Sequence, residues 1–179
     1  GRYTERTADI DRFSWNHKDF LVFVAAGNSG PGPGTVGSPA TGKNVVGVGA
    51  ALHGDQEPPC VAPFSSRGPT LDGRLKPDLV VPGQAVVSAA SDGTVSSGNC
   101  GLRPSSGTSM AAPTAAGLAA LVRQYYEDGF YPGGAADPAR GFAPSAALVR
   151  ATLVAAAVDL AEFGCTDVER VPSRGQGWG

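Results

Sequence analysis

The sequence predicts an α/β fold built around a mostly parallel β-sheet. Continuous apolar runs at residues 19–26 and 45–50 are typical of strands covered on both faces, as in parallel sheets. Helical spacing of apolar side chains occurs over residues 4–15, 110–126 and 144–160. Because a helix precedes a buried strand, as in half of a βαβ unit, a parallel sheet is favoured.

Length and composition indicate one globular domain. The chain has 179 residues, 41% of them hydrophobic and 17% charged, which is enough for a core. Its 26 glycines and 15 prolines cluster between apolar runs and predict many tight loops. The net charge is −2 without a basic block, and no apolar run reaches the roughly 18 residues of a membrane helix. We therefore expect neither nucleic acid nor a membrane as a partner.

The three cysteines, Cys60, Cys100 and Cys165, show no C-x-x-C spacing and no accompanying histidine cluster, so we expect no zinc site. An odd number leaves at least one cysteine without a partner in this chain. Spacing does not decide which of them pair.

Residues Thr4 to Trp15 are predicted to form an amphipathic helix with Ile10 and Phe13 on one face and charges around them. His17 follows at the C-terminal end, where a histidine suits the helix dipole. We interpret it as a solvated side chain and not as a catalytic one. The apolar run that comes next is predicted to be a buried strand that ends at Gly27.

The glycine-rich loop 27–34 leaves the carboxyl end of that strand, which is where open α/β sheets place their sites. Asn28 in this loop is, by itself, an ordinary turn residue. Residues 32–37 match G-x-G-x-x-G, but dinucleotide binding requires a helix that opens at these glycines. The strand-like run 45–50 follows instead, so we reject nucleotide binding.

The middle of the chain is predicted to contain loops and short strands. A polar loop spans residues 52–63, and the segment 64–69 is interpreted as structural. Residues 76–83 form a short strand bounded by prolines, residues 85–89 form another, and a Gly/Ser-rich loop covers 91–106.

Gly107–Pro113 places Ser109 on the first turn of a helix that is predicted to be buried nearly all round. Pro113 is tolerated in a first turn, where N–H groups have no helical partner, so we expect it to mark the helix start. A serine there is often only a helix cap. The unpaired N–H groups and the positive end of the helix also favour an oxyanion and a reacting hydroxyl.

After a glycine- and proline-rich loop at 129–143, a second helix is predicted over Pro144–Leu160, with Pro144 at its start. One side of that helix is expected to pack, namely Leu148, Ala151, Ala155 and Val158.

Gly107–Pro113 resembles the nucleophile motif of the subtilisin-like serine proteases, the subtilases. Ala25-Ala26-Gly27-Asn28, followed by Ser-Gly, resembles the oxyanion segment of that family and precedes the serine in the same order. The resemblance extends from about Thr4 to Trp178. It implies a three-layer α/β/α subtilisin-like fold with a mostly parallel sheet, so residues 1–179 are expected to be part of one catalytic domain.

The resemblance also implies roles for individual residues. Ser109 would attack the scissile carbonyl and form an acyl-enzyme, while its own N–H and the Asn28 amide hold the oxyanion. Gly37-Ser38 corresponds to a segment near the pocket for the residue before the scissile bond. The residues expected to bind substrate are Ala25, Ala26, Gly27, Gly37 and Ser38.

A general base for Ser109 is missing from the sequence. Subtilases contain their Asp and His motifs upstream of the Asn segment, but residues 1–27 match neither, and no histidine follows Ser109. His53-Gly54 resembles the start of the His motif, yet it lacks the Thr-His continuation and lies after Asn28. We expect a missing N-terminal part of the domain to supply both groups, which leaves this piece inactive alone. The alternative is a catalytically silent, subtilase-like peptide-binding module.

Other hydrolase families fit less well. Gly107-x-Ser109-x-Ala111 nearly matches the G-x-S-x-G elbow, but that elbow needs a strand before the serine and a histidine after it. A chymotrypsin-like fold would be all-β, which the two long helices contradict.

The resemblance further implies an endopeptidase with an extended polypeptide substrate, secretion from the cell and no required cofactor. Family members often bind structural calcium. No loop here has closely spaced carboxylates, so no metal ligands are assigned.

Overall fold

The computed structural model describes residues 1–53 and 59–179. Its central sheet contains β1 (Val22–Ala25), β2 (Val45–Ala51) and β3 (Leu79–Pro82) in the order β1-β2-β3. Both strand pairs are parallel, with Val22 beside Val45 and Val48 beside Leu79. The carboxyl ends of the strands therefore meet at one edge of the sheet.

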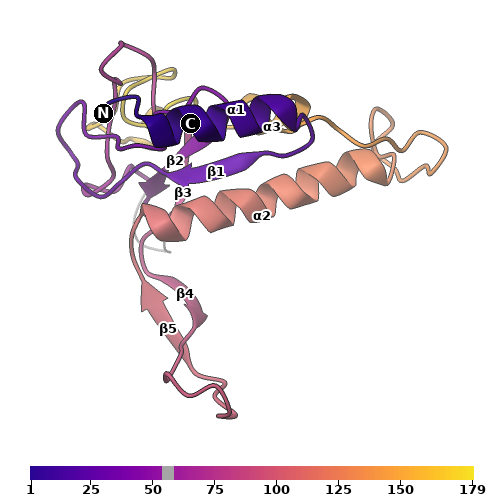
Figure 1. Ribbon diagram of the computed structural model, residues 1–179, viewed down its shortest axis with the longest axis horizontal. Coiled ribbons are helices and arrows are strands. Elements are labelled where there is room, and N and C mark those ends of the chain that lie inside the picture. The colour runs from indigo at the N-terminus through magenta and orange to yellow at the C-terminus, as the bar shows by residue number, and fades with distance from the viewer. Residues whose placement is uncertain (54–58) are drawn as a thin grey trace.

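Helices lie on both faces of this sheet. Figure 1 shows α1 (Glu5–Asn16) and α3 (Ala146–Ala155) on one side and α2 (Thr108–Glu127) on the other. Helix α2 packs against all three strands. The arrangement confirms the predicted α/β class with a parallel sheet.

The core lies between β2, β3 and the start of α2. Strand β2 is buried along its whole length, whereas β1 at the sheet edge is only half-buried. The prediction that β1 is a fully buried strand was therefore wrong. Within the described residues β1 is an edge strand, with β2 on one side and no strand on the other. The main core cluster consists of Val46, Val48, Ala50, Ala62, Leu79, Val81, Ala111, Ala112 and Ala115.

Helix α1 forms where expected, and the side chain of Thr4 caps its N-terminus. Its buried face differs from the apolar face of the sequence pattern, because the buried residues are Thr7, Asp11 and Ser14. Asp11 explains the difference. Its carboxylate accepts hydrogen bonds from the backbone N–H groups of Lys43 and Asn44, each at 2.8 Å, so α1 docks through polar contacts and not through Ile10 and Phe13.

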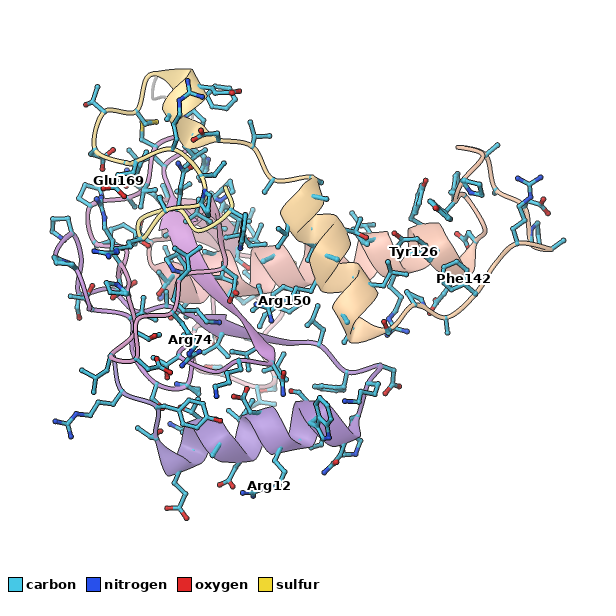
Figure 2. The ribbon with its side chains drawn as sticks, turned by 90° about the horizontal axis from the view of Figure 1, so that it is seen from above. Arg12, Arg74, Tyr126, Phe142, Arg150 and Glu169 are labelled. Carbon is cyan, nitrogen blue, oxygen red and sulfur yellow. A yellow bond between two sulfur atoms is a disulfide. The ribbon has the colours of Figure 1, made fainter. Side chains whose placement is uncertain are left out.

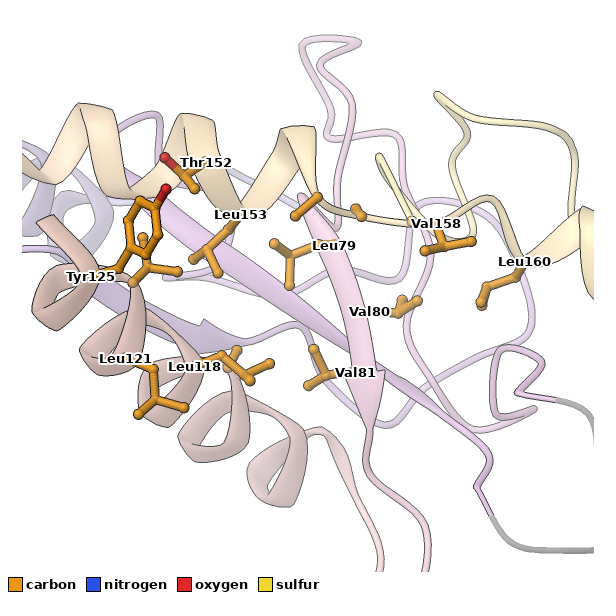
Figure 3. A pocket seen from close by; sticks show the side chains of 15 residues that line it. Leu79, Val80, Val81, Leu118, Leu121, Tyr125, Thr152, Leu153, Val158 and Leu160 are labelled. Carbon is orange, nitrogen blue, oxygen red and sulfur yellow. The ribbon is translucent and has the colours of Figure 1, made fainter. Parts of the chain in front are cut away.

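Helix α2 begins at Thr108, and Pro113 lies inside it in the second turn, so the proline does not mark the helix start. Nor is the helix buried all round, since Leu118, Leu121 and Tyr125 remain exposed. These side chains line an apolar groove of about 600 Å³ between α2, β3 and the segment from α3 to residue 160 (Figure 3).

Strand β4 (Val86–Ala89) does not join the central sheet. It pairs antiparallel with β5 (Leu102–Ser105) to form a hairpin that projects away from the body of the molecule near the start of α2 (Figure 1). The prediction of a loop throughout 91–106 missed β5. Only the pairing with β4 makes that Arg-Pro-Ser stretch a strand, since its own sequence has weak β-propensity.

Helix α3 is shorter than predicted. Ser145 caps it, with its hydroxyl accepting from the Leu148 N–H at 3.2 Å, and the helix ends at Ala155. A 3₁₀ turn, η1 (Leu160–Phe163), follows. The buried α3 residue is Val149, whereas the predicted packing side is half-buried at Leu148 and exposed at Ala151, Ala155 and Val158.

Two long-range links attach α3 and the C-terminal segment to the sheet. Cys60 and Cys165 form a disulfide, which decides the pairing that spacing left open, and Cys100 is free and exposed. Arg150 of α3, labelled in Figure 2, forms a salt bridge with the buried Asp78, which also pairs with the buried Lys76.

No helix among the described residues is long and apolar enough to cross a membrane.

Candidate active site

The candidate site forms where the end of β1 meets the start of α2. The Oδ1 atom of Asn28 accepts hydrogen bonds from the backbone N–H of Thr108 at 2.9 Å and from its hydroxyl at 3.0 Å. The neighbouring Gly27 N–H donates to the same hydroxyl at 3.1 Å. Three bonds therefore join the two segments that the sequence predicted to act together.

These bonds fix the orientation of the Asn28 amide. The backbone N–H groups of Gly27 and Thr108 can only donate, so the Thr108 hydroxyl accepts from Gly27 and must direct its own proton at Asn28. The atom of Asn28 that receives these bonds is therefore its carbonyl oxygen. Its NH₂ group has no partner among residues 1–53 and 59–179, so it is free to donate to a ligand.

Ser109 lies at the second position of α2, with its side chain exposed. Of the first three N–H groups of the helix, that of Thr108 donates to Asn28 and that of Met110 to the Gly107 carbonyl at 3.0 Å. Within the described part of the chain the Ser109 N–H has no partner, so it remains a donor at the positive end of the helix.

Two glycines allow this close approach. Gly107 has a φ of +151°, and a Cβ there would lie 3.2 Å from the Asn28 Nδ2 atom. Gly83, after β3, accepts the Gly107 N–H at 2.8 Å, and a Cβ on it would lie 2.7 Å from that of Ala50. Side chains at either position would push the serine segment away from Asn28.

The expected substrate-binding residues lie beside this site, but they are not equivalent. Ala25 ends β1, and the fully buried Ala26 accepts the Gly37 N–H at 3.0 Å, which joins the two predicted segments. The Ser38 hydroxyl instead bonds to the hydroxyls of Thr4 and Thr7, at 2.6 and 2.8 Å. The Ser38 side chain therefore supports the start of α1.

Sequence reasoning treated residues 64–69 as structural and did not connect them with Asn28. In the structure this segment lies against the Asn28 loop: the Gly30 N–H donates to the Phe64 carbonyl at 2.9 Å, and the Thr35 N–H to the Arg67 carbonyl at 2.8 Å. The Phe-Ser-Ser-Arg-Gly-Pro sequence marks this segment as a shaped loop. However, no feature of the neighbouring sequence indicated that it contacts the Asn28 loop.

No histidine hydrogen-bonds to Ser109 within residues 1–53 and 59–179. The Nδ1 atom of His17 lies 2.8 Å from the Phe13 carbonyl in an exposed position, and His53 is also exposed. Gly54, the second residue of the partial His motif, lies outside the described residues. Within the described residues, therefore, no histidine is placed to accept a proton from the Ser109 hydroxyl.

Over the part of the chain that the structure describes, no group of three or more His, Cys, Asp or Glu residues could hold a metal ion. We therefore assign no ligands.

The fold and this site define a class: an α/β chain in which the helix start that carries a serine is hydrogen-bonded to an asparagine at the end of a parallel strand. Comparison with known proteins agrees, because the model of the subtilase family matches residues 1–179. The chain belongs to the subtilase family.

Relatives support this membership. The serine protease AprX of Bacillus subtilis is 42% identical over 118 residues, which are 60% of this chain and 27% of AprX. Subtilisin of Bacillus sp. strain TA39 is 43% identical over 122 residues, covering 64% of this chain and 27% of its own length. The chain thus spans about a quarter of these two relatives.

Solved structures show the same fold. The S41 psychrophilic protease matches with a TM-score of 0.56 and 31% identity, over 81% of this chain and 42% of that one. A lanthipeptide protease matches 97% of this chain and 51% of its own, with a TM-score of 0.67 at 23% identity, and supports the fold alone.

Proposed function

We propose that this chain supplies the nucleophile and the oxyanion donors of a serine endopeptidase. One observation supports the proposal most directly: Thr108 binds the Asn28 carbonyl oxygen, and within the described residues neither the Asn28 NH₂ group nor the nearby Ser109 N–H has a hydrogen-bond partner. Two donors fixed before substrate arrives can stabilise a developing oxyanion without reorganising.

In the proposed reaction Ser109 Oγ attacks the scissile carbonyl carbon of a polypeptide. The hydroxyl proton passes to a histidine that this chain does not provide, and the carbonyl oxygen becomes an oxyanion that accepts from the Ser109 N–H and Asn28 Nδ2. The tetrahedral intermediate expels the amine, which takes the proton, and leaves an acyl-enzyme on Ser109. Water then hydrolyses the ester and restores the serine.

The base and its orienting carboxylate are proposed to come from the rest of the catalytic domain, upstream of this chain. The match covers only 27% of AprX, so most of the AprX sequence lies outside it, and the proposed upstream part would correspond to some of that sequence. By itself the chain is then inactive, and the parent protein is a secreted enzyme that binds an extended polypeptide, partly through Ala25–Gly27 and Gly37. The second candidate, a silent peptide-binding module, is favoured only by the absence of a base among the described residues.

A fluorophosphonate probe on the full-length gene product tests the proposal. The wild type should be labelled, Ser109→Ala should not, and Ser96→Ala, which changes an exposed hairpin serine, should be labelled like the wild type. No labelling of a folded wild type would support the peptide-binding module. A parent sequence without the Asp and His motifs would do the same. Hydrolysis by the 179-residue piece alone would instead contradict the proposal that the base comes from outside this chain.

A further inference from the structure

We propose that Ser66 is a positioning residue for the oxyanion donor Asn28. The inference rests on the proposed function and adds a residue to it. Ser66 touches no reacting atom; it holds the backbone on both sides of Asn28 and acts only through that side chain.

Ser66 bonds to both neighbours of Asn28. Its N–H donates to the Gly27 carbonyl at 2.9 Å, and its hydroxyl accepts the Ser29 N–H at 3.1 Å. Ser66 is fully buried, so its own N–H and hydroxyl depend on these protein partners. The Ser66 backbone N–H therefore fixes the chain before Asn28, and the Ser66 hydroxyl fixes it after Asn28.

The contact with Gly27 is too close for any other residue there. A Cβ on Gly27 would lie 2.8 Å from Ser66 Oγ, and the φ of Gly27 is +113°. From the other side, the Gly27 N–H donates to the Thr108 hydroxyl, which in turn donates to Asn28 Oδ1. Ser66 thus belongs to a connected set of hydrogen bonds that ends at the Asn28 amide.

The segment that contains Ser66 is itself well anchored. Arg67 forms a salt bridge with Asp167 at 2.8 Å, and its N–H donates to the Thr35 hydroxyl at 2.9 Å. The Gly34 N–H donates to the Gly68 carbonyl at 2.9 Å. Ser66 therefore projects from a fixed support against the Asn28 loop.

The adjacent serine provides a matched control. Ser65 is equally buried, and its hydroxyl accepts one backbone N–H at 3.0 Å, but the donor is Ala50 of β2. Replacing either serine by alanine removes one hydroxyl and leaves one backbone N–H without its acceptor. Only the Ser66 change loosens the oxyanion loop.

The oxyanion forms only in the transition state, so a displaced Asn28 should lower kcat and leave KM unchanged. In the full-length protein we expect Ser66→Ala to lower kcat about 10- to 100-fold, the range for a displaced catalytic group. KM should remain within about twofold, and Ser65→Ala should retain the wild-type kcat.

A double-mutant cycle with Asn28→Ala separates positioning from general structural damage. Once Asn28 is absent, Ser66→Ala should cost less than about twofold more in kcat, because the group it positions has gone. A full additional loss in the Asn28→Ala background would overturn the proposal, as would an equal loss of kcat in Ser65→Ala.

Hydrogen exchange of the full-length protein gives a readout independent of activity. Ser66→Ala should speed exchange in peptides that contain residues 27–30 and the Thr108 amide, whereas Ser65→Ala should speed it in β2. If the wild type has no peptidase activity, the proposed function fails, and exchange alone then decides whether Ser66 holds the loop. Unchanged exchange at residues 27–30 and Thr108 in Ser66→Ala would refute the positioning role.

Discussion

The Asn28 side chain accepts a hydrogen bond from the Thr108 backbone N–H at 2.9 Å, across 80 positions of sequence. This bond joins the end of β1 to the start of α2. It also decides which end of the Asn28 amide faces outward, because the oxygen is engaged, whereas the NH₂ group has no partner within residues 1–53 and 59–179. The chemistry of the candidate site depends on that orientation.

Asn28→Ala should lower kcat of the full-length enzyme by about 10²–10³, a range established on subtilisin for the loss of one oxyanion donor. The change also removes the Oδ1 atom that accepts from Thr108, but the oxyanion exists only in the transition state, so KM should change little. Steady-state kinetics on a peptide substrate measure both constants. The control is Asn16→Ala at the exposed end of α1, and an unaltered kcat in Asn28→Ala would remove Asn28 from the mechanism.

Thr108→Val should lower both kcat and stability. It leaves the Gly27 N–H without an acceptor, at a cost of about 1–3 kcal/mol, and it removes one of the two bonds to Asn28. Thr108→Ser keeps the hydroxyl and should remain near the wild type in both respects. Urea unfolding and kinetics of the three proteins provide the comparison, and a serine variant as impaired as the valine variant would contradict the hydroxyl's role.

Asp78→Asn should destabilise the protein by about 3–5 kcal/mol, because it leaves the buried Lys76 ammonium without its carboxylate. Burial lowers the pKa of Lys76 and Asp78 opposes that shift, so the ammonium depends on Asp78 for an opposite charge, while the Val45 carbonyl accepts a further hydrogen bond from it at 3.2 Å. Denaturant unfolding measures the loss. Asp9→Asn, which breaks an exposed pair with Arg12, should cost less than about 1 kcal/mol.

Removing the disulfide with Cys60→Ser and Cys165→Ser should lower the free energy of unfolding by about 2–4 kcal/mol. The bond links residues 105 positions apart, so it strongly restricts the unfolded chain. Cys100→Ser should change stability by less than about 0.5 kcal/mol, since that thiol is free and exposed. Thermal unfolding with and without reductant provides an independent measurement, and an insensitive wild type would argue against the pairing.

Acid should remove a small part of the stability through Asp72. Hydrogen bonds from Arg74 and then Thr70 lower the pKa of Asp72 to about 2. Because the folded-state pKa lies below that of the unfolded chain, the contribution is complete above about pH 4 and disappears as the pH falls towards 2. Unfolding measured from pH 5 to 2 should show a shallower pH dependence in Asp72→Asn, and identical curves would contradict this prediction.

Periodicity predicted where most elements lie but not which of their faces are buried. The apolar pattern of α1 pointed to Ile10 and Phe13, yet Asp11 is buried because two loop N–H groups bind it. Likewise, Leu121 of α2 fits a buried helix by sequence but is 63% exposed. A pattern shows that a side is apolar, whereas only the neighbouring segments decide what covers it.

The sequence by itself predicted strands β1 to β4 and a helix start close to Ser109, and it assigned roles to Ser109 and Asn28 that stay predictions, because each depends on residues adjacent in the chain. Tertiary structure alone decided the orientation of the Asn28 amide, the β4–β5 pairing, the disulfide and the place of Ser66. Those features depend on hydrogen bonds and covalent links between distant segments, such as the 37 positions between Ser29 and Ser66. Local spacing contains no information about such partners, since the chain must fold before their atoms come within bonding distance.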